Sequence, residues 1–299
     1  MNKLISVNFT RLKKSKIFWI GLIGMFAYGV GNSVFCYFRG QQVGYDTVIL
    51  NEVFFGHGNI IGFIAAAFCS VFLSTEYREG AIRNKLIVGN TRTSVYLSNL
   101  IVNSIAMLVI NLSYMLAICI IGIPLLGNIV DIEMIVVLKL FGLNILATLS
   151  FTAFFTLIGM IQENSVIATI IGISIALVLF FVSPFINEQL LEPKVLASFS
   201  YSEETNEEII TSQRPNPYYV GGAKRSFYDF LADFLPSGHF VQINKEMEIG
   251  TEEEMAPEIS SGLVDIKIPN YTKMSLYELL LIAVTTGIGV FIFGKKDLK

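Results

Sequence analysis

Residues 134–161 read MIVVLKLFGLNILATLSFTAFFTLIGMI, an apolar run with a single ionisable side chain, Lys139. About 20 helical residues suffice to cross ~30 Å of hydrocarbon, so this run can span a membrane. The chain is 53% apolar and 15% charged, with a mean hydropathy of +0.62, outside the range of soluble domains. The fold class expected is therefore an all-α integral membrane protein with six transmembrane helices, the other five at 17–38, 53–73, 95–121, 165–186 and 276–293.

The distribution of Lys and Arg predicts how these spans are oriented. Six spans place both termini on one side, and the cations concentrate in the terminal segments and in the loop between the second and third spans. The opposite short loops contain Arg39. Because short cytoplasmic loops carry the excess of Lys and Arg, we expect both termini in the cytoplasm. No small-residue cleavage site precedes the first span, which is expected to be retained.

Three regions follow from this topology. Residues 1–187 are expected to form a bundle of five spans, 188–275 an extracellular insertion of mixed structure, and 276–299 the sixth span with a cytoplasmic tail. From Asn187 to Ser275 there are 15 acidic and 7 basic residues, so the outer segment is anionic.

The N-terminus has helical periodicity of its own. Met1, Ile5, Phe9 and Leu12 recur at helical spacing, whereas most of the cations fall elsewhere. This pattern favours an interfacial helix lying on the inner leaflet with its cations toward anionic lipids. The other interpretation is a basic flank that only fixes the topology.

The polar loop at 75–92 reads TEYREGAIRNKLIVGNTR. Gly89 can end a helix there, and Asn90 or Thr91 can cap the next one. A helix is favoured over a solvated connector by three pairs at i,i+4 spacing, namely Glu79 with Arg83, Tyr77 with Ala81, and Ile82 with Leu86.

These features together resemble the permease subunits of type 2 ABC exporters. The resemblance is carried by the six spans, by EYREGAIRNKL at 76–86, by RTSVYLS at 92–98 and by FGKKDL at 293–298. In that family the loop after the second span is a coupling helix that docks on the ATPase subunit. The residues implied in this contact are Glu76, Tyr77, Arg78, Glu79, Ala81, Ile82, Arg83, Asn84 and Lys85.

The short loop of Gln162, Glu163 and Asn164 is similar to the family's second cytoplasmic contact, although a simple polar turn is an equal interpretation. The resemblance further implies two copies of an ABC ATPase, a second permease that is identical or similar, and a plasma membrane of bacterial origin. An outer insertion of this size departs from the compact family pattern.

The sequence offers no catalytic centre. Residues 289–296, GVFIFGKK, match the spacing of a phosphate-binding loop, but Lys296 stands where Ser or Thr must reach Mg²⁺, and the segment lies in a span. His57 and His239 are expected outside the membrane, without metal-ligand partners. We therefore expect no enzyme, cofactor, metal or nucleic-acid site in this chain, with ATP and Mg²⁺ bound by the separate ATPase.

Polar residues within the spans are few. Lys139 and Glu278 lie near outer ends, where their side chains are expected to snorkel toward water. Asn103, Asn111 and Asn144 are expected to hydrogen-bond between helices. An apolar lining suits a lipid-like or amphipathic peptide cargo better than an ion.

The outer segment contains an amphipathic pattern between 225 and 235, with apolar residues at relative positions 0, 3, 4, 7 and 8: Phe227, Phe230, Leu231, Phe234 and Leu235. This helix could lie on the outer leaflet, cap the transport path or form the core of an outer domain. Residues 259–268 predict a short strand, and 203–208 and 246–258 predict solvated acidic stretches.

An acidic outer surface attracts cationic peptides, which suggests an antimicrobial-type peptide as the exported or expelled cargo. The same acidity would also arise without any cargo if basic residues are simply kept in the cytoplasmic loops, which leaves the outer loops acidic. The alternative function is a non-transporting membrane sensor or receptor with an outer ligand-binding domain.

Overall fold

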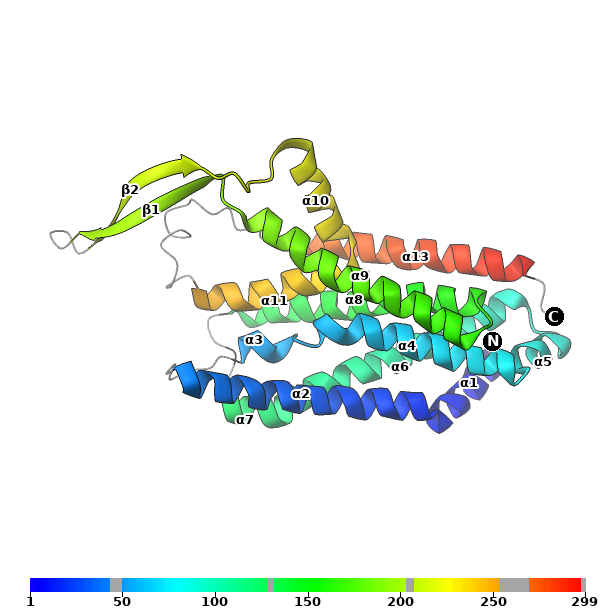
Figure 1. Cartoon of the computed structure of the whole chain (residues 1–299). Coiled ribbons are helices and arrows are strands. Elements are labelled where there is room, and N and C mark those ends of the chain that lie inside the picture. The colour runs from blue at the N-terminus through cyan, green and yellow to red at the C-terminus, as the bar shows by residue number, and fades with distance from the viewer. Residues whose placement is uncertain (44–49, 128, 130–131, 203–206, 253–268, 297–299) are drawn as a thin grey trace.

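The protein is a helical bundle from which one β-hairpin projects (Figure 1). The computed structural model describes residues 1–43, 50–127, 129, 132–202, 207–252 and 269–296. Along the first half of the chain the elements are α1 (Asn2–Lys14), α2 (Lys16–Val43), α3 (Asn51–Phe54), α4 (Gly58–Arg78), α5 (Ala81–Ile87), α6 (Arg92–Ala117), the π-helical turn η1 (Ile118–Gly122) and α7 (Ile123–Leu126). The second half contains α8 (Met134–Ile161), α9 (Ser165–Leu191), β1 (Val195–Ser202), β2 (Glu207–Pro215), α10 (Gly222–Phe234), α11 (Pro236–Glu252) and α13 (Tyr271–Lys295).

Six helical segments are long and apolar enough to cross a membrane, which confirms the expected all-α membrane fold. They cover Lys16–Gln42, Asn51–Arg78, Arg92–Leu126, Met134–Ile161, Ser165–Leu191 and Tyr271–Lys295. The fifth and sixth spans therefore extend a few residues farther into the outer segment than the sequence pattern indicated. Figure 1 places both termini and α5 at one end of the bundle, here called the α5 end, and the β-hairpin at the opposite hairpin end.

The interior of the bundle is built from α4, α6 and α8. About half of the apolar window of these spans is buried, at 56%, 56% and 44%, compared with 22%, 17% and 22% for the spans of α2, α9 and α13. The latter three helices therefore present most of their apolar surface outward. In α1, by contrast, the buried stripe contains Leu4, Asn8 and Leu12, whereas Met1 is exposed. The buried face of α1 thus includes Asn8, a polar residue that a search for apolar periodicity does not identify.

Asparagines connect the interior helices, as expected. Asn103 donates to the Thr156 hydroxyl at 3.0 Å, and Asn111 donates to the Thr148 hydroxyl at 2.6 Å. Asn144 Oδ1 lies 2.8 Å from the Nε2 atom of His57. His57 was expected outside the membrane, but it lies within the candidate span Asn51–Arg78, and its ring is fully buried in this polar group.

The outer segment has more regular structure than its sequence indicated. β1 and β2 pair as an antiparallel hairpin with an irregularity between Ser198 and Phe199. The amphipathic helix expected at 225–235 is present as α10. The acidic stretch at 246–258 begins inside α11, and the strand expected at 259–268 lies outside the described residues.

Helix α11 packs against α4, α8 and α9. Its Phe240, Ile243 and Met247 are buried in the same core as the membrane helices. These residues recur at helical spacing, so the periodicity that could have predicted α11 was present in the sequence. This part of the outer segment therefore shares the hydrophobic core of the bundle.

Candidate functional site

The α4–α5 turn is organised by two glycines with left-handed backbone. Gly80 has φ of +66° and separates α4 from α5, while Gly89 has φ of +95° and follows the end of α5. Residues with a Cβ rarely adopt this conformation, so glycine suits both positions. Thr91 then caps α6, because its hydroxyl accepts a hydrogen bond from the Ser94 amide at 3.2 Å.

The break at Gly80 corrects two of the expected helical pairs. Glu79 follows the last residue of α4 and does not belong to α5, so the pairs Glu79–Arg83 and Tyr77–Ala81 do not lie on one helix. Among the described residues, Glu79 and Arg83 form no ion pair.

The third pair was correct, since Ile82 and Leu86 both lie on α5 and pack in one core cluster. Of the two, Ile82 is buried and Leu86 is half-buried.

A buried charged group lies directly behind α5. Glu76 accepts hydrogen bonds from the side chains of Arg11 and Lys85, and its other oxygen accepts one from Asn99 at 2.7 Å. Asn8 closes the group: its carbonyl accepts from Lys85 and its amide donates to Asn99, both at 2.7 Å. We call these five residues the Glu76 cluster. It connects α1, α4, α5 and α6, which are far apart in the sequence.

Burial dominates the electrostatics of this cluster. The Glu76 side chain is 0% exposed and that of Lys85 is 8% exposed. Burial lowers the pKa of the Lys85 ammonium from its ordinary value, and the nearby Glu76 carboxylate opposes that shift. The pKa of Arg11 is lowered for the same reason. The two cations tolerate this environment because Glu76 accepts from both, the Asn8 carbonyl accepts from Lys85 and the Phe72 carbonyl accepts from Arg11.

Burial divides the nine residues expected at a partner contact into two groups. Glu76, Ile82 and Lys85 are buried inside the chain, and Tyr77 and Ala81 are half-buried. Four remain exposed to a partner, namely Arg78, Glu79, Arg83 and Asn84.

Two exposed apolar residues of the turn were missed by sequence reasoning. Ile87 is 74% exposed and Val88 is 81% exposed, at the end of α5 and directly before Gly89. At about 100° of rotation per residue, neither can share the buried face of Ile82 and Leu86, and this signal was available in the sequence. Two adjacent apolar side chains at the tip of a polar turn form a small contact surface, which we call the α5 tip.

The turn at 162–164 is joined to the chain's last described residues. Asn164 caps α9 by accepting a hydrogen bond from the Val166 amide at 2.9 Å. The Lys296 ammonium lies 3.1 Å from a Glu163 carboxylate oxygen and donates to the Ile161 carbonyl at 2.8 Å. The turn is therefore held by Lys296, which directly follows α13, while Glu163 and Asn164 stay exposed and Gln162 is half-buried.

Comparison with known families gives the chain its class. A family model described as "ABC-2 family transporter protein" matches residues 40–298. The chain belongs to the ABC-2 transporter family. It is a transmembrane permease component that is not itself catalytic, and the family associates in general with ABC ATPase subunits. A search among curated proteins finds no significant match.

The match to the ABC-2 permease family begins within α2. The helix α1, which supplies Asn8 and Arg11 to the Glu76 cluster, thus lies outside the matched residues.

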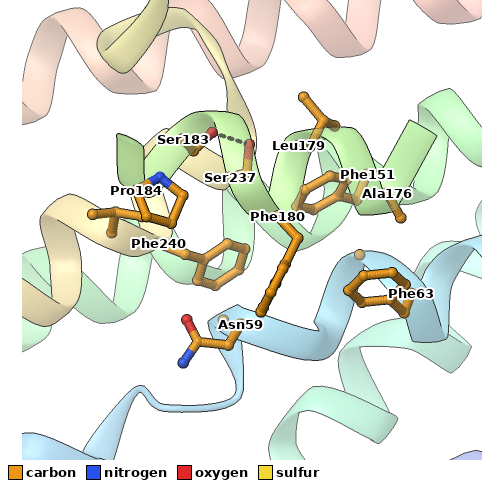
Figure 2. Close-up of a pocket in the computed structure, with 13 residues that line it drawn as sticks. Asn59, Phe63, Phe151, Ala176, Leu179, Phe180, Ser183, Pro184, Ser237 and Phe240 are labelled. Atoms are coloured by element: carbon orange, nitrogen blue, oxygen red, sulfur yellow. Dashed lines mark hydrogen bonds between the residues drawn. The ribbon is translucent and has the colours of Figure 1, made fainter. Parts of the chain in front are cut away.

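At the hairpin end of this ABC-2 permease, α11 closes the space between α4, α8 and α9. Figure 2 shows the rings of Phe63, Phe151, Phe180 and Phe240 around a small cavity. Its volume of about 30 Å³ gives room for about one water molecule and excludes a bulky ligand. The hydroxyls of Ser183 and Ser237, 2.6 Å apart, tie α9 to α11 beside it.

The second buried polar group of the permease joins α10, α11 and α13. His239 and Glu278 are both 0% exposed, with His239 Nδ1 at 2.5 Å from a Glu278 oxygen. His239 Nε2 lies 2.5 Å from the Asp233 carbonyl, which can only accept, so Nε2 carries hydrogen. The expectation that Glu278 snorkels toward water is wrong, because its side chain is fully buried. His239 lies on α11, which is not among the six candidate spans, and its position outside the membrane stays a prediction.

Helix α10 is only partly covered. Its Leu231 and Ala232 pack against Ile186 and Leu190 of α9. Phe230 and Phe234 stack on each other and meet the Tyr277 ring of α13, with centroids 5.9 and 5.8 Å from it.

Two members of the expected apolar face still point outward to different degrees. Phe227 is 57% exposed and Phe230 is 43% exposed, whereas Leu235 is half-buried at the end of α10.

The described residues contain no group of three His, Cys, Asp or Glu side chains that could hold a metal ion.

Proposed function

We propose that this ABC-2 permease is the membrane subunit of an ATP-driven exporter in a bacterial plasma membrane. It forms the translocation path with a second permease, identical or similar, and couples to two separate ATPase subunits that bind ATP and Mg²⁺. Both termini and α5 lie in the cytoplasm, which is supported by the concentration of Lys and Arg at that end.

The observation that carries the proposal is the α5 tip. Ile87 and Val88 are exposed apolar residues on a polar surface, flanked by the exposed Arg83 and Asn84. Such a patch suits the apolar centre of an interface, and the charged residues around it suit the rim. The ATPase would bind here.

The Glu76 cluster provides the connection from α5 into the membrane. Because Lys85 of α5 is joined to Glu76 of α4, and Glu76 to Asn99 of α6, a displacement of α5 must move these helices or break a buried ion pair. Closure of the two ATPases would therefore reach the bundle as rigid-body movement of α4 and α6.

The proposed cargo is an amphipathic or lipid-like molecule, in particular an antimicrobial-type cationic peptide. Two features support it: the excess of acidic over basic residues between Asn187 and Ser275, and the exposed phenylalanines of α10. Acidic residues attract the cations of such a peptide, and Phe227 offers it apolar contact.

The test removes the apolar character of the α5 tip and leaves its surroundings unchanged. The variant is Ile87→Ser with Val88→Ser, and its matched control is Ile87→Leu with Val88→Ile. Full burial of each aliphatic side chain contributes about 1.5–3 kcal/mol, so loss of both should weaken ATPase binding at least about tenfold. The control should bind like the wild type.

Binding is measured by co-purification from native membranes and by titration with the recovered ATPase. ATP-dependent transport is then followed in vesicles containing both subunits. Equal affinity of the serine variant and the control contradicts docking at the α5 tip. Absence of any co-purifying ATPase, together with ligand binding that does not depend on ATP, favours the receptor function instead.

A further inference from the structure

A cavity of about 540 Å³ lies in the elbow between α1 and α2, against the last turns of α4. It is at the α5 end of the bundle but separate from the α5 tip, because its walls come from residues 11–17 and 71–79. Part of the lining, here called the charged wall, carries charged side chains, and another part, here called the apolar wall, is formed by aliphatic and aromatic residues. This division suits a ligand with a charged head and an apolar tail.

The charged wall has an excess of cations. Lys14, Lys16 and Arg78 line it, are exposed, and form no ion pair with any described residue. The only carboxylate in the lining is Glu79, since the charge of Arg11 is already compensated by Glu76. Three cations against one carboxylate leave the cavity positively charged. It therefore favours an anion.

The apolar wall is formed by Ile17, Val71 and Phe72, of which Phe72 is nearly fully buried. Outside the lining, Ile20 and Ile23 of α2 are exposed apolar residues, at 65% and 62%. Surface of this kind faces acyl chains in a membrane protein. An apolar part of the lining suits the acyl chains of a lipid, which a free ion does not have.

Trp19 marks the depth of the cavity in the membrane. Its ring is about half-exposed, and its indole nitrogen donates to the Lys13 carbonyl at 2.9 Å. Tryptophan is enriched at the level of the lipid head groups, where its ring is apolar and its N–H meets polar atoms. Because Trp19 follows Lys16 by three residues on α2, the cationic wall lies at head-group level.

We propose that this cavity binds the phosphate head group of an anionic phospholipid, with its acyl chains along the apolar wall and α2. Lys14, Lys16 and Arg78 contact the phosphate. Because Arg78 is the last residue of α4 before the turn into α5, the bound lipid also fixes the position of that turn. The site does not depend on which cargo the permease carries or on docking at the α5 tip.

The chain's single tryptophan makes the proposal testable in the full-length protein. The protein is reconstituted into vesicles of phosphatidylcholine that contain a fraction of brominated phosphatidylglycerol or brominated phosphatidylcholine. Bromine quenches tryptophan at short range, so Trp19 fluorescence measures the lipid held beside the cavity. The wild type should prefer brominated phosphatidylglycerol, because its head group is net negative whereas that of phosphatidylcholine is neutral overall, by about fivefold for each cation at the site.

The test variant replaces Lys14, Lys16 and Arg78 with Gln, and should quench equally with either lipid. The matched control replaces Lys3, Lys13 and Arg83 with Gln, which removes the same charge from the same end without touching the cavity, and should keep the preference. All six residues are exposed, and the emission spectrum of Trp19 checks the fold.

Two outcomes overturn the proposal. Equal loss of preference in the test variant and the control means diffuse attraction to the surface charge and no site. Loss of preference on addition of millimolar inorganic phosphate, at an ionic strength matched with sodium chloride, means that the cavity binds a free anion and not a lipid head group. Neither outcome bears on ATPase docking at the α5 tip.

Discussion

Replacement of Glu76 by Gln is the most direct test of the buried cluster. The change keeps the size of the side chain and removes its charge. Arg11 and Lys85 then lose their shared carboxylate, while Asn99 can still donate to the remaining amide oxygen. Lys85 keeps the Asn8 carbonyl as its single partner at 2.7 Å.

The magnitude follows from the exposure of the two cations. Removing one partner of a buried ion pair costs about 3–5 kcal/mol, because the other charge stays buried. Lys85, 8% exposed, cannot reach water without moving α5, but Arg11, 21% exposed, can turn partly outward. We therefore expect the lower end of the range, a loss of about 3 kcal/mol in the free energy of unfolding.

The measurement is reversible unfolding in mixed micelles, followed by circular dichroism. The control is Glu79→Gln, an exposed carboxylate of the same turn, which should change the free energy by less than about 0.5 kcal/mol. Lys85→Met alone leaves Glu76 paired with Arg11 and should cost about 1–2 kcal/mol, through loss of its charged hydrogen bonds.

The double variant with Glu76→Gln and Lys85→Met decides whether the pair acts as a unit. It no longer contains the buried ammonium, so we expect it to lose about 2 kcal/mol less than the sum of the two single changes. A Glu76→Gln protein as stable as the control, or strict additivity of the two changes, would refute the account of a coupled buried pair.

Two further perturbations test the packing at the hairpin end. His239→Ala leaves the Glu278 carboxylate buried without its partner and should cost about 3 kcal/mol of unfolding free energy, more than Glu278→Gln, which leaves an imidazole that can be neutral. The reverse order in the same unfolding assay contradicts the account of a buried His239–Glu278 pair. Gly58→Ala would place a methyl group in the Phe240 ring and should cost about 1–3 kcal/mol of unfolding free energy. The control, Gly24→Ala, meets nothing within 4 Å and should be nearly neutral in thermal unfolding. Equal effects of the two changes would show that α11 does not pack against Gly58.

Much of the fold could be predicted because its signals are local. Hydrophobic run length located all six spans, and the glycine and threonine at Gly89 and Thr91 marked where α5 ends and α6 begins. The periodicity at 225–235 likewise located α10. Each of these signals depends only on neighbours within a few turns of helix, so no tertiary information was needed.

The burial of charged residues could not be predicted in the same way. Glu76 and Lys85 belong to a polar loop by every local criterion, and their place in the sequence suggested a surface that meets a partner. They are buried because α1 covers them, with Arg11 and Asn8 arriving from the beginning of the chain. The sequence pattern of α1 did not show that Asn8 would face inward.

The sequence by itself determined that this protein is a membrane bundle of six helices with a structured polar turn after the second span. Only the tertiary structure decided which part of that turn is internal and which is available to a partner. Hydrophobic periodicity reports which face of a helix avoids water, but it does not report what covers that face. A buried charge such as Glu76 is tolerated only where opposite charges from distant segments reach it, and the fold alone brings those segments together.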